Sequence, residues 1–235
     1  MSRSTLRGSA ITAEIRKAQA AAAAAPVDPT ATKKNAKDKA ATAAAPKGAG
    51  EIRIIGGQWK RTRLPVAQRP GLRPTPDRVR ETLFNWLGQD LSGWRCLDAF
   101  AGTGALGLEA ASRGAASVQL VESDAALVAQ LQVLQAKLQA SEVRVQRGDG
   151  VAALKQAAPA SVDLVLLDPP FDGDLFAPAL QAAAKAVAAQ GFIYLEAPRA
   201  WTDEELAGSG LAVYRHLKAG AVHAHLLRPV AATTE

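Results

Sequence analysis

Strand-like and helix-like segments alternate along the sequence from residue 94 onward. The strand-like runs lie at 95–100, 117–122, 142–147, 162–168 and 191–197. Helical patterns follow them at 104–113, at 124–139, over a short stretch from 150, and at 175–189. Strands that alternate with helices predict an α/β fold, in which a mostly parallel sheet is covered by helices on both faces.

Two more strands close the sequence, at 211–217 and 221–228, after a short acidic helix at 203–207. The tripeptide Lys218-Ala219-Gly220 is expected to turn one strand into the other, so that the pair adds an antiparallel hairpin. The predicted sheet therefore has about seven strands, most of them parallel.

A small element is predicted ahead of this domain. Gly56-Gly57 separates two short strand-like runs between residues 51 and 65, which is a hairpin signal. Thr75 is a plausible helix N-cap with Pro76 at the first helical position, and Gly88 can end that helix. We therefore expect one β-hairpin and one helix before the sheet.

Positive charge is concentrated at the front of the chain. Residues 1–50 carry nine Lys and Arg against three acids, and residues 51–80 carry eight against two. Because the whole chain has a net charge of +6, the remainder must be acidic. This asymmetry favours a polyanionic partner that the front binds, with a merely solvated surface as the alternative.

Composition divides the chain into three segments. Residues 1–50 are rich in Ala and Lys and lack aromatic side chains, so we expect a disordered tail; an organelle transit peptide is the alternative. Residues 51–90 would form the basic hairpin and helix, and residues 91–235 the α/β domain. No stretch approaches the roughly 18 apolar residues of a membrane span, so no membrane association is expected.

The single cysteine and the three histidines do not indicate a disulfide or a metal site. Cys96 lies inside the first strand of the sheet, where packing is expected, and one free thiol fits a reducing cytosol. His216, His223 and His225 lie on the closing strands without a Cys or acid among them. We expect no bound metal.

Ligands of an open α/β sheet bind outside the carboxyl ends of its strands, so the residues where strands stop are informative. The first strand reaches Asp98, which Gly102 and Gly104 follow. These glycines allow a tight turn and bring the N–H groups of the helix start to a ligand, while Asp98 suits a cationic group. A plain tight turn is the alternative reading.

The next two strands also lead to acids. Glu122 ends the second strand, 20 residues after Gly102, where an acid commonly binds two ribose hydroxyls. Asp149 follows the third strand, and its carboxylate could accept a hydrogen bond from an adenine amino group.

The fourth strand runs into Asp168-Pro169-Pro170-Phe171. Because proline has no N–H and disfavours helix in the residue before it, this loop is held extended. It presents a carboxylate, free carbonyl oxygens and an aromatic face. That set suits a planar group with an exocyclic NH2, whereas a turn followed by a core Phe is the alternative.

Together these motifs resemble a known family. Residues 94–197 look like a class I, Rossmann-like S-adenosylmethionine-dependent methyltransferase, and DPPF is similar to the signature of amino-group methyltransferases. The segments RIIGGQWKRTRLPV, GLRPTPDRVRETLFNWL and CLDAFAGTGALGLEA closely resemble the RsmD family of bacterial 16S rRNA guanine-N2 methyltransferases. The resemblance covers about residues 51–230 and leaves the first 50 outside.

The resemblance implies methyl transfer from S-adenosylmethionine to N2 of the family's guanine 966 site, with S-adenosylhomocysteine as the product and no metal. It implies a catalytic set of Asp168, Pro169, Pro170 and Phe171. It implies a cofactor-binding set of Asp98, Phe100, Gly102, Gly104, Glu122 and Asp149. The basic front offers the candidate phosphate contacts Arg53, Lys60, Arg61, Arg63, Arg73, Arg78 and Arg80.

Several roles remain open at this point. Asp168 and the Pro169 carbonyl would accept the two N2 hydrogens, and whether Asp168 also takes the proton is open. Arg78 or Arg80 could instead be structural or touch the cofactor carboxylate. Trp59 could stack on a base or belong to the core.

Two other functions compete with this interpretation. A DNA amino-methyltransferase acting on adenine N6 shares the DPPF chemistry, but usually carries a sizeable recognition domain. A nucleic-acid-binding module with a non-catalytic methyltransferase fold would not need an acid at each strand end. The expected partner is 16S rRNA, free or in an assembling 30S particle, bound by a monomer in the bacterial cytoplasm.

Overall fold

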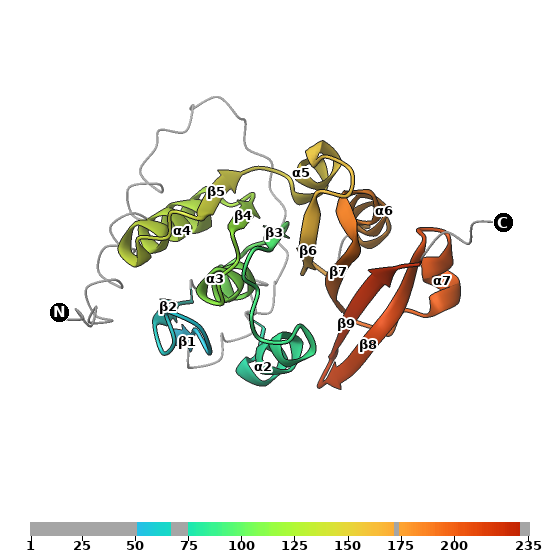
Figure 1. Cartoon of the computed structure of the whole chain (residues 1–235), viewed down its shortest axis with the longest axis horizontal. Coiled ribbons are helices and arrows are strands. Elements are labelled where there is room, and N and C mark those ends of the chain that lie inside the picture. The colour runs from blue at the N-terminus through green and yellow to red at the C-terminus, as the bar shows by residue number, and fades with distance from the viewer. Residues whose placement is uncertain (1–50, 67–74, 172–173, 231–235) are drawn as a thin grey trace, which may run out of the picture.

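A mixed sheet runs through the part of the chain that the computed structural model describes, namely residues 51–66, 75–171 and 174–230 (Figure 1). Among these residues, its seven strands are β3 (Arg95–Asp98), β4 (Ser117–Glu122), β5 (Val143–Arg147), β6 (Val162–Leu167), β7 (Val187–Ala197), β8 (Leu211–Ala219) and β9 (Val222–Pro229). The helices there are α2 (Asp77–Trp86), α3 (Ala105–Ser112), α4 (Ala125–Leu138), α5 (Gly150–Gln156), α6 (Phe176–Ala186) and α7 (Asp203–Ala207).

The strand order is β5-β4-β3-β6-β7-β9-β8. Strands β3 to β7 pair in parallel, and β9 pairs antiparallel with both β7 and β8. The chain moves outward from β3 through β4 to β5 and then crosses back to β6, so the topological switch point lies between β3 and β6. The predicted α/β sheet with an antiparallel closing hairpin is confirmed.

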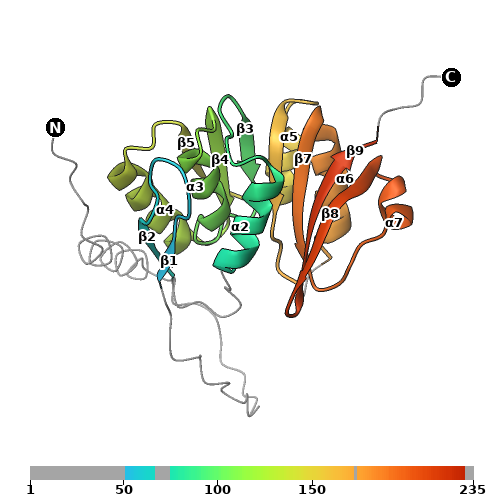
Figure 2. The ribbon, with the colours of Figure 1, turned by 60° about the horizontal axis from the view of Figure 1, so that its bottom comes forward.

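The strands are apolar on both faces because helices cover both sides. Within β6, Leu164 and Leu166 pack on the side of α2, α3 and α4, whereas Val165 and Leu167 pack on the side of α5, α6 and α7. This alternation follows from the two-residue period of a strand. Figure 2 shows α2 and the front hairpin on one side of the sheet and α5 and α6 on the other.

The front hairpin exists but differs from the prediction. Its strands, β1 (Glu51–Arg53) and β2 (Arg63–Pro65), are short, and a long loop joins them. Gly56-Gly57 does not form a tight turn; it lies in that loop against the end of α3. A Cβ at Gly57 would come within 1.8 Å of the Ser112 carbonyl oxygen, so the loop touches α3 directly.

Some predicted boundaries were wrong because distant contacts outweigh local signals. Strand β7 starts at Val187, inside the predicted helix, since Val187 pairs with Val162 of β6. Pro76, not Thr75, is the N-cap of α2, because the Thr75 hydroxyl donates to Glu196 instead. The closing hairpin turns at 220–221, where Gly220 has φ +61°, rather than over 218–220. Gly88, with φ +87°, does follow the end of α2, as predicted.

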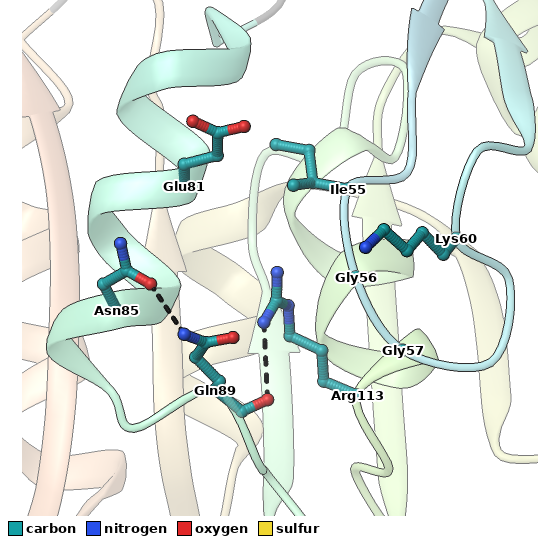
Figure 3. A pocket seen from close by; sticks show the side chains of 8 residues that line it. All are labelled: Ile55, Gly56, Gly57, Lys60, Glu81, Asn85, Gln89 and Arg113. Atoms are coloured by element: carbon teal, nitrogen blue, oxygen red, sulfur yellow. Dashed lines mark hydrogen bonds between the residues drawn. The ribbon is translucent and has the colours of Figure 1, made fainter.

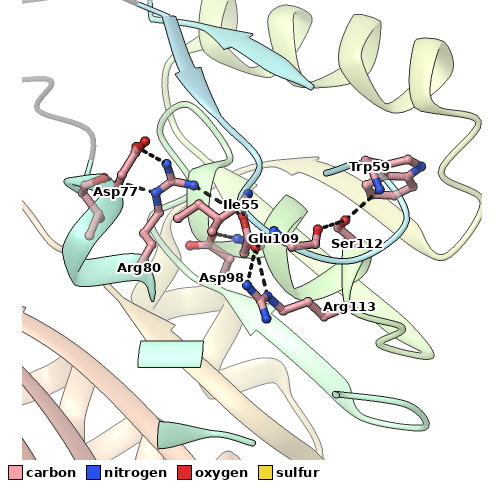
Figure 4. A network of polar contacts seen from close by, with 11 residues as sticks. Ile55, Trp59, Asp77, Arg80, Asp98, Glu109, Ser112 and Arg113 are labelled. Carbon is pink, nitrogen blue, oxygen red and sulfur yellow. Dashed lines mark hydrogen bonds and ion pairs between the residues drawn. The ribbon is translucent and has the colours of Figure 1, made fainter. Parts of the chain in front are cut away.

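A buried carboxylate joins the front of the chain to the sheet domain (Figure 4). Both oxygens of Glu109, on α3, accept hydrogen bonds of 2.7 Å from the loop N–H groups of Ile55 and Gly56. The same carboxylate pairs with Arg80 of α2 at 3.5 Å and with Arg113 at 2.9 Å. One charged group thus connects the loop, α2 and α3.

The predicted tail, residues 1–50, lies outside the described residues, and its disorder stays a prediction. Among the described residues, no helix is long and apolar enough to cross a bilayer.

Replacing Glu109 by glutamine should lower the free energy of unfolding by about 3–5 kcal/mol, because the buried guanidinium groups of Arg80 and Arg113 then lose the negative charge between them. Urea unfolding followed by circular dichroism measures this. The matched control is Glu51→Gln, which removes an exposed carboxylate paired with Arg63 and should leave the midpoint unchanged. Equal losses in the two variants would contradict the linking role of Glu109.

Candidate active site

The parallel strands bring four acids to one edge of the sheet. Asp98 ends β3 and Glu122 ends β4, while Asp149 and Asp168 follow β5 and β6. Because β5, β4, β3 and β6 are neighbours that run in the same direction, their carboxyl ends share this edge. The edge also contains the switch point, where open α/β sheets bind ligands.

Asp98 is the most buried of these acids. Its side chain is 1% exposed and accepts a 3.0 Å hydrogen bond from the Gly107 N–H. Burial raises the pKa of Asp98 to about 7, a shift that the N–H groups of Gly107 and Phe100 partly oppose and the charges of Glu122 and Glu196 increase. A cationic ligand group beside Asp98 would stabilise its ionised form.

The glycine loop after β3 is shaped for close approach. Gly102 and Gly104 have φ angles of +52° and +78°, and Gly104 caps α3. The Gly102 N–H donates to Glu122 Oε2 at 2.8 Å, which ties the loop after β3 to the end of β4. Gly107, one turn into α3, has no space for a side chain, since a Cβ would lie 2.2 Å from Leu120 and 3.0 Å from Asp98.

Asp149 and Phe100 lie beside each other at the next loop. A Cβ on Gly150 would come within 2.1 Å of the Ala99 carbonyl oxygen and 3.1 Å of the Phe100 ring, so the loop after β5 packs on the loop after β3. Asp149 is exposed and caps α5 by accepting from the Ala152 N–H at 2.7 Å.

The DPPF loop extends the site beyond β6. Asp168 is half-buried, Pro169 is buried, and the Phe171 ring is 42% exposed. Desolvation first, then the charges of Glu196 and Asp98, raises the pKa of Asp168 well above its usual range. The Phe171 ring lies 6.3 Å from the ring of Phe176, centroid to centroid, in a tilted arrangement.

The sequence reasoning missed Glu196, the second-last residue of β7. Leu195 of β7 is aligned with Leu167 of β6, so Glu196 lies alongside Asp168. Its side chain is 3% exposed, and Oε1 accepts hydrogen bonds from Thr75 at 2.5 Å and Tyr194 at 3.0 Å. Like the other acids, Glu196 stands near the end of a strand-like run, GFIYLEA, so the same sequence signal marks it.

The candidate phosphate contacts fall into two groups. The side chains of Arg53, Lys60, Arg61, Arg63 and Arg78 are exposed, whereas Arg73 lies outside the described residues. Arg80 is fully buried and paired with Asp77 and Glu109, so its predicted RNA contact is wrong and the structural alternative holds.

The front loop and α2 enclose a cavity of about 370 Å³. Lys60 projects into it from the loop, while Glu81, Asn85 and Gln89 line it from α2 and its end, and Arg113 lies at its floor (Figure 3). The cavity therefore adds both hydrogen-bond donors and hydrogen-bond acceptors to the basic front.

The remaining side chains singled out in the sequence are mainly structural. Cys96 is buried in β3, and burial raises the pKa of its thiol to about 12. Trp59 is half-buried and packs against the core. His216 and His223 contact each other at 3.0 Å between ring nitrogens, and His225 accepts from the Trp201 N–H at 3.1 Å.

Comparison with known proteins extends these observations. The family model described as conserved hypothetical protein 95 matches residues 52–228. Ribosomal RNA small subunit methyltransferase D of Escherichia coli K12 is 52% identical over 124 residues, which cover 53% of this chain and 62% of that protein. The protein of the same name from Haemophilus influenzae is 45% identical over 134 residues, covering 55% and 69%. The matched segment thus spans less than two thirds of the first of these relatives.

A solved structure gives a longer match. The putative methyltransferase yhhF of Escherichia coli superposes with a TM-score of 0.67 and 41% identity, over 77% of this chain and 99% of that one.

Replacing Asp98 by asparagine should stabilise the protein at pH 8 by a few kcal/mol and change little at pH 4. The raised pKa of Asp98 means that the native state resists its ionisation, so wild type loses stability as the pH rises from about 4 to about 7, and the variant does not. Unfolding in urea across this range measures the difference.

The control variant is Asp163→Asn, because the hydrogen bond from Arg95 lowers the pKa of Asp163. Its stability relative to wild type should fall as the pH rises through the range below about 4, which is the opposite sign, and should stay constant from about pH 4 to 7. Parallel curves of unfolding free energy against pH for wild type and Asp98→Asn would show that ionisation of Asp98 does not destabilise the native state.

Proposed function

The chain belongs to the RsmD family, and on this premise we propose that it methylates the exocyclic N2 amine of a guanine in 16S rRNA with S-adenosylmethionine. Its fold is that of the class I methyltransferases. The observation that carries the proposal is the DPPF loop at the end of β6, beside the switch point and next to buried Asp98.

The residues at the strand ends fit this methyl donor, whose sulfonium supplies an electrophilic methyl group when bound. Asp98 and the loop around Gly102 and Gly104 would hold the cationic methionine part. Glu122 would accept from the ribose hydroxyls, and Asp149 with Phe100 would hold the adenine. The support is the buried Asp98 carboxylate, which pairs with no Lys or Arg of the described residues, and the close loop packing that leaves room only for glycine at 107 and 150.

The DPPF loop would orient the nucleophile. The N2 lone pair of guanine is delocalised into the ring, so N2 is a weak nucleophile. Asp168 and the Pro169 carbonyl, by accepting both N2 hydrogens, would favour a pyramidal nitrogen that directs its lone pair at the methyl group. Positioning and electrostatics would supply most of the rate. Phe171 would stack on the extruded base, which returns about 1–3 kcal/mol of the cost of unstacking.

The basic front, residues 51–90, would bind the rRNA, while residues 91–235 carry out the reaction. Arg53, Lys60 and Arg61 are exposed there, and so are Arg63 and Arg78. We further propose that the protein works as a monomer in the bacterial cytoplasm, on rRNA within an assembling 30S particle. A DNA amino-methyltransferase remains the second candidate, on the strength of the DPPF loop alone.

Radiolabelled methyl transfer to naked 16S rRNA, to 30S particles from a strain without the family's methylation, and to duplex DNA tests these proposals together. Label in N2-methylguanine of rRNA supports the main proposal. Label in adenine of DNA would replace it with the second candidate, and cofactor binding without label in any substrate would favour a non-catalytic module.

Replacing Asp168 by alanine should abolish methyl transfer, because one of the two acceptors for the N2 hydrogens is lost. Cofactor affinity, measured by calorimetry, should stay close to that of wild type, since Asp168 holds the substrate amine. Normal methylation by this variant would contradict the assigned role.

Removing two exposed cations from the front loop should weaken RNA binding and reduce its salt dependence. For Lys60→Ala with Arg61→Gly, we expect the slope of log Kobs against log salt to decrease by about two. Glycine suits position 61, whose φ is +71°. The matched control, Lys155→Ala with Lys185→Ala, removes two exposed cations from α5 and α6 on the other face. An identical slope in all three proteins would contradict RNA binding by the loop.

A further inference from the structure

Two carboxyl groups lie side by side where β6 and β7 end. Asp168 directly follows Leu167, and Glu196 directly follows Leu195, the residue aligned with Leu167 in the parallel pair. Like charges on adjacent strands in a desolvated site cannot both ionise without cost, so such pairs separate into two members of different proton affinity.

The surroundings of the two groups decide which member holds the negative charge. Glu196 Oε1 accepts two hydrogen bonds, from the Thr75 hydroxyl at 2.5 Å and the Tyr194 hydroxyl at 3.0 Å. By contrast, burial and the charges of Glu196 and Asp98 raise the pKa of Asp168, and no hydrogen bond from the described residues opposes them. Hydrogen bonds to a carboxylate favour its charged form, so they stabilise the charge on Glu196 and leave Asp168 with the greater affinity for a proton.

On the basis of the proposed function, we propose that Glu196 is a positioning residue that makes Asp168 the acceptor of the guanine N2 proton. Glu196 itself touches neither guanine nor the methyl group. Thr75 and Tyr194 hold its carboxylate, and its negative charge acts on Asp168 across the strand pair.

The proposed reaction consists of one methyl transfer and one proton transfer. The N2 lone pair forms the new N–CH3 bond, and the C–S bond breaks with its electrons remaining on sulfur, which becomes a neutral thioether. The methylated nitrogen then carries a positive charge. An N2–H bond breaks with its electrons returning to nitrogen, and the proton moves to a carboxylate oxygen of Asp168. No further reactant is needed.

The charged and titratable groups around Asp168 come from two neighbouring strands. Glu196 and Tyr194 of β7 act on it from one side and Asp98 of β3 from the other. Burial raises the pKa of Glu196, whereas the hydrogen bonds from Thr75 and Tyr194 lower it. Removing the Glu196 charge should therefore lower the pKa of Asp168, which makes Asp168 a weaker base that ionises at lower pH.

The test is the pH profile of single-turnover methyl transfer to rRNA by wild type, Glu196→Gln and Glu196→Asp. Glutamine keeps the size of the side chain and an acceptor for Thr75 and Tyr194. For Glu196→Gln we expect the ascending limb of the rate-against-pH profile to move to lower pH by about one unit. The plateau rate should fall on the order of tenfold. Aspartate restores the charge and should return the limb toward wild type. Cofactor affinity and KM for rRNA should change little in either variant.

The matched control is Glu142→Gln, because Glu142 precedes β5 at the opposite edge of the sheet. Its profile should equal that of wild type. A profile of Glu196→Gln that keeps the wild-type limb would overturn the inference while leaving the proposed function standing, and so would a uniform loss that aspartate does not restore. Absence of methyl transfer by wild type itself would instead remove the proposed function.

If Glu196→Gln fails to fold, Tyr194→Phe decides the question. Loss of the Tyr194 hydroxyl removes a hydrogen bond that stabilises the ionised form of Glu196. The ascending limb of the pH profile should therefore shift toward lower pH, in the same direction as for Glu196→Gln. An unshifted limb in a folded, cofactor-binding Tyr194→Phe protein would then overturn the inference.

Discussion

The carboxyl group of Glu109 makes the contacts on which the arrangement of the front of the molecule depends. It lies fully buried on α3, the helix that Gly104 of the glycine loop caps. Two backbone N–H groups and two guanidinium groups surround it, so its burial is compensated by charge-assisted hydrogen bonds. These contacts hold the basic loop against α2 and α3.

A series of polar contacts connects Glu109 to the strand ends. Arg80 is held by Glu109, and its Nε also donates to the Thr75 carbonyl at 3.2 Å. The Thr75 hydroxyl in turn donates to Glu196. A continuous set of polar contacts thus leads from the front loop through the start of α2 to the residue beside Asp168, and it fixes the basic surface and the strand-end acids in one rigid frame.

The strand ends could be predicted from the sequence because each signal is local. A strand such as SVQLVE is recognised by its own composition, and the acid that ends it is the next informative residue. Glu109 could not be placed in this way, since its partners Arg80 and Ile55 lie 29 and 54 residues away. Thr75 was assigned to a local cap for the same reason, although its partner Glu196 lies 121 residues away. Local propensity cannot weigh a contact of that separation.

The acids of the candidate site lack a cationic partner among the described residues. In the part of the chain that the structure describes, no Lys or Arg forms an ion pair with Asp98, Asp168 or Glu196. Their desolvation and mutual repulsion are therefore offset only in part, by N–H groups that donate to Asp98 and by hydroxyl groups that donate to Glu196. A cationic ligand group beside Asp98 would lower the pKa of that acid, since an opposite charge favours the ionised form. Under the proposed function the methyl donor would supply this charge at Asp98, whereas Asp168 would be left to accept from the substrate amine.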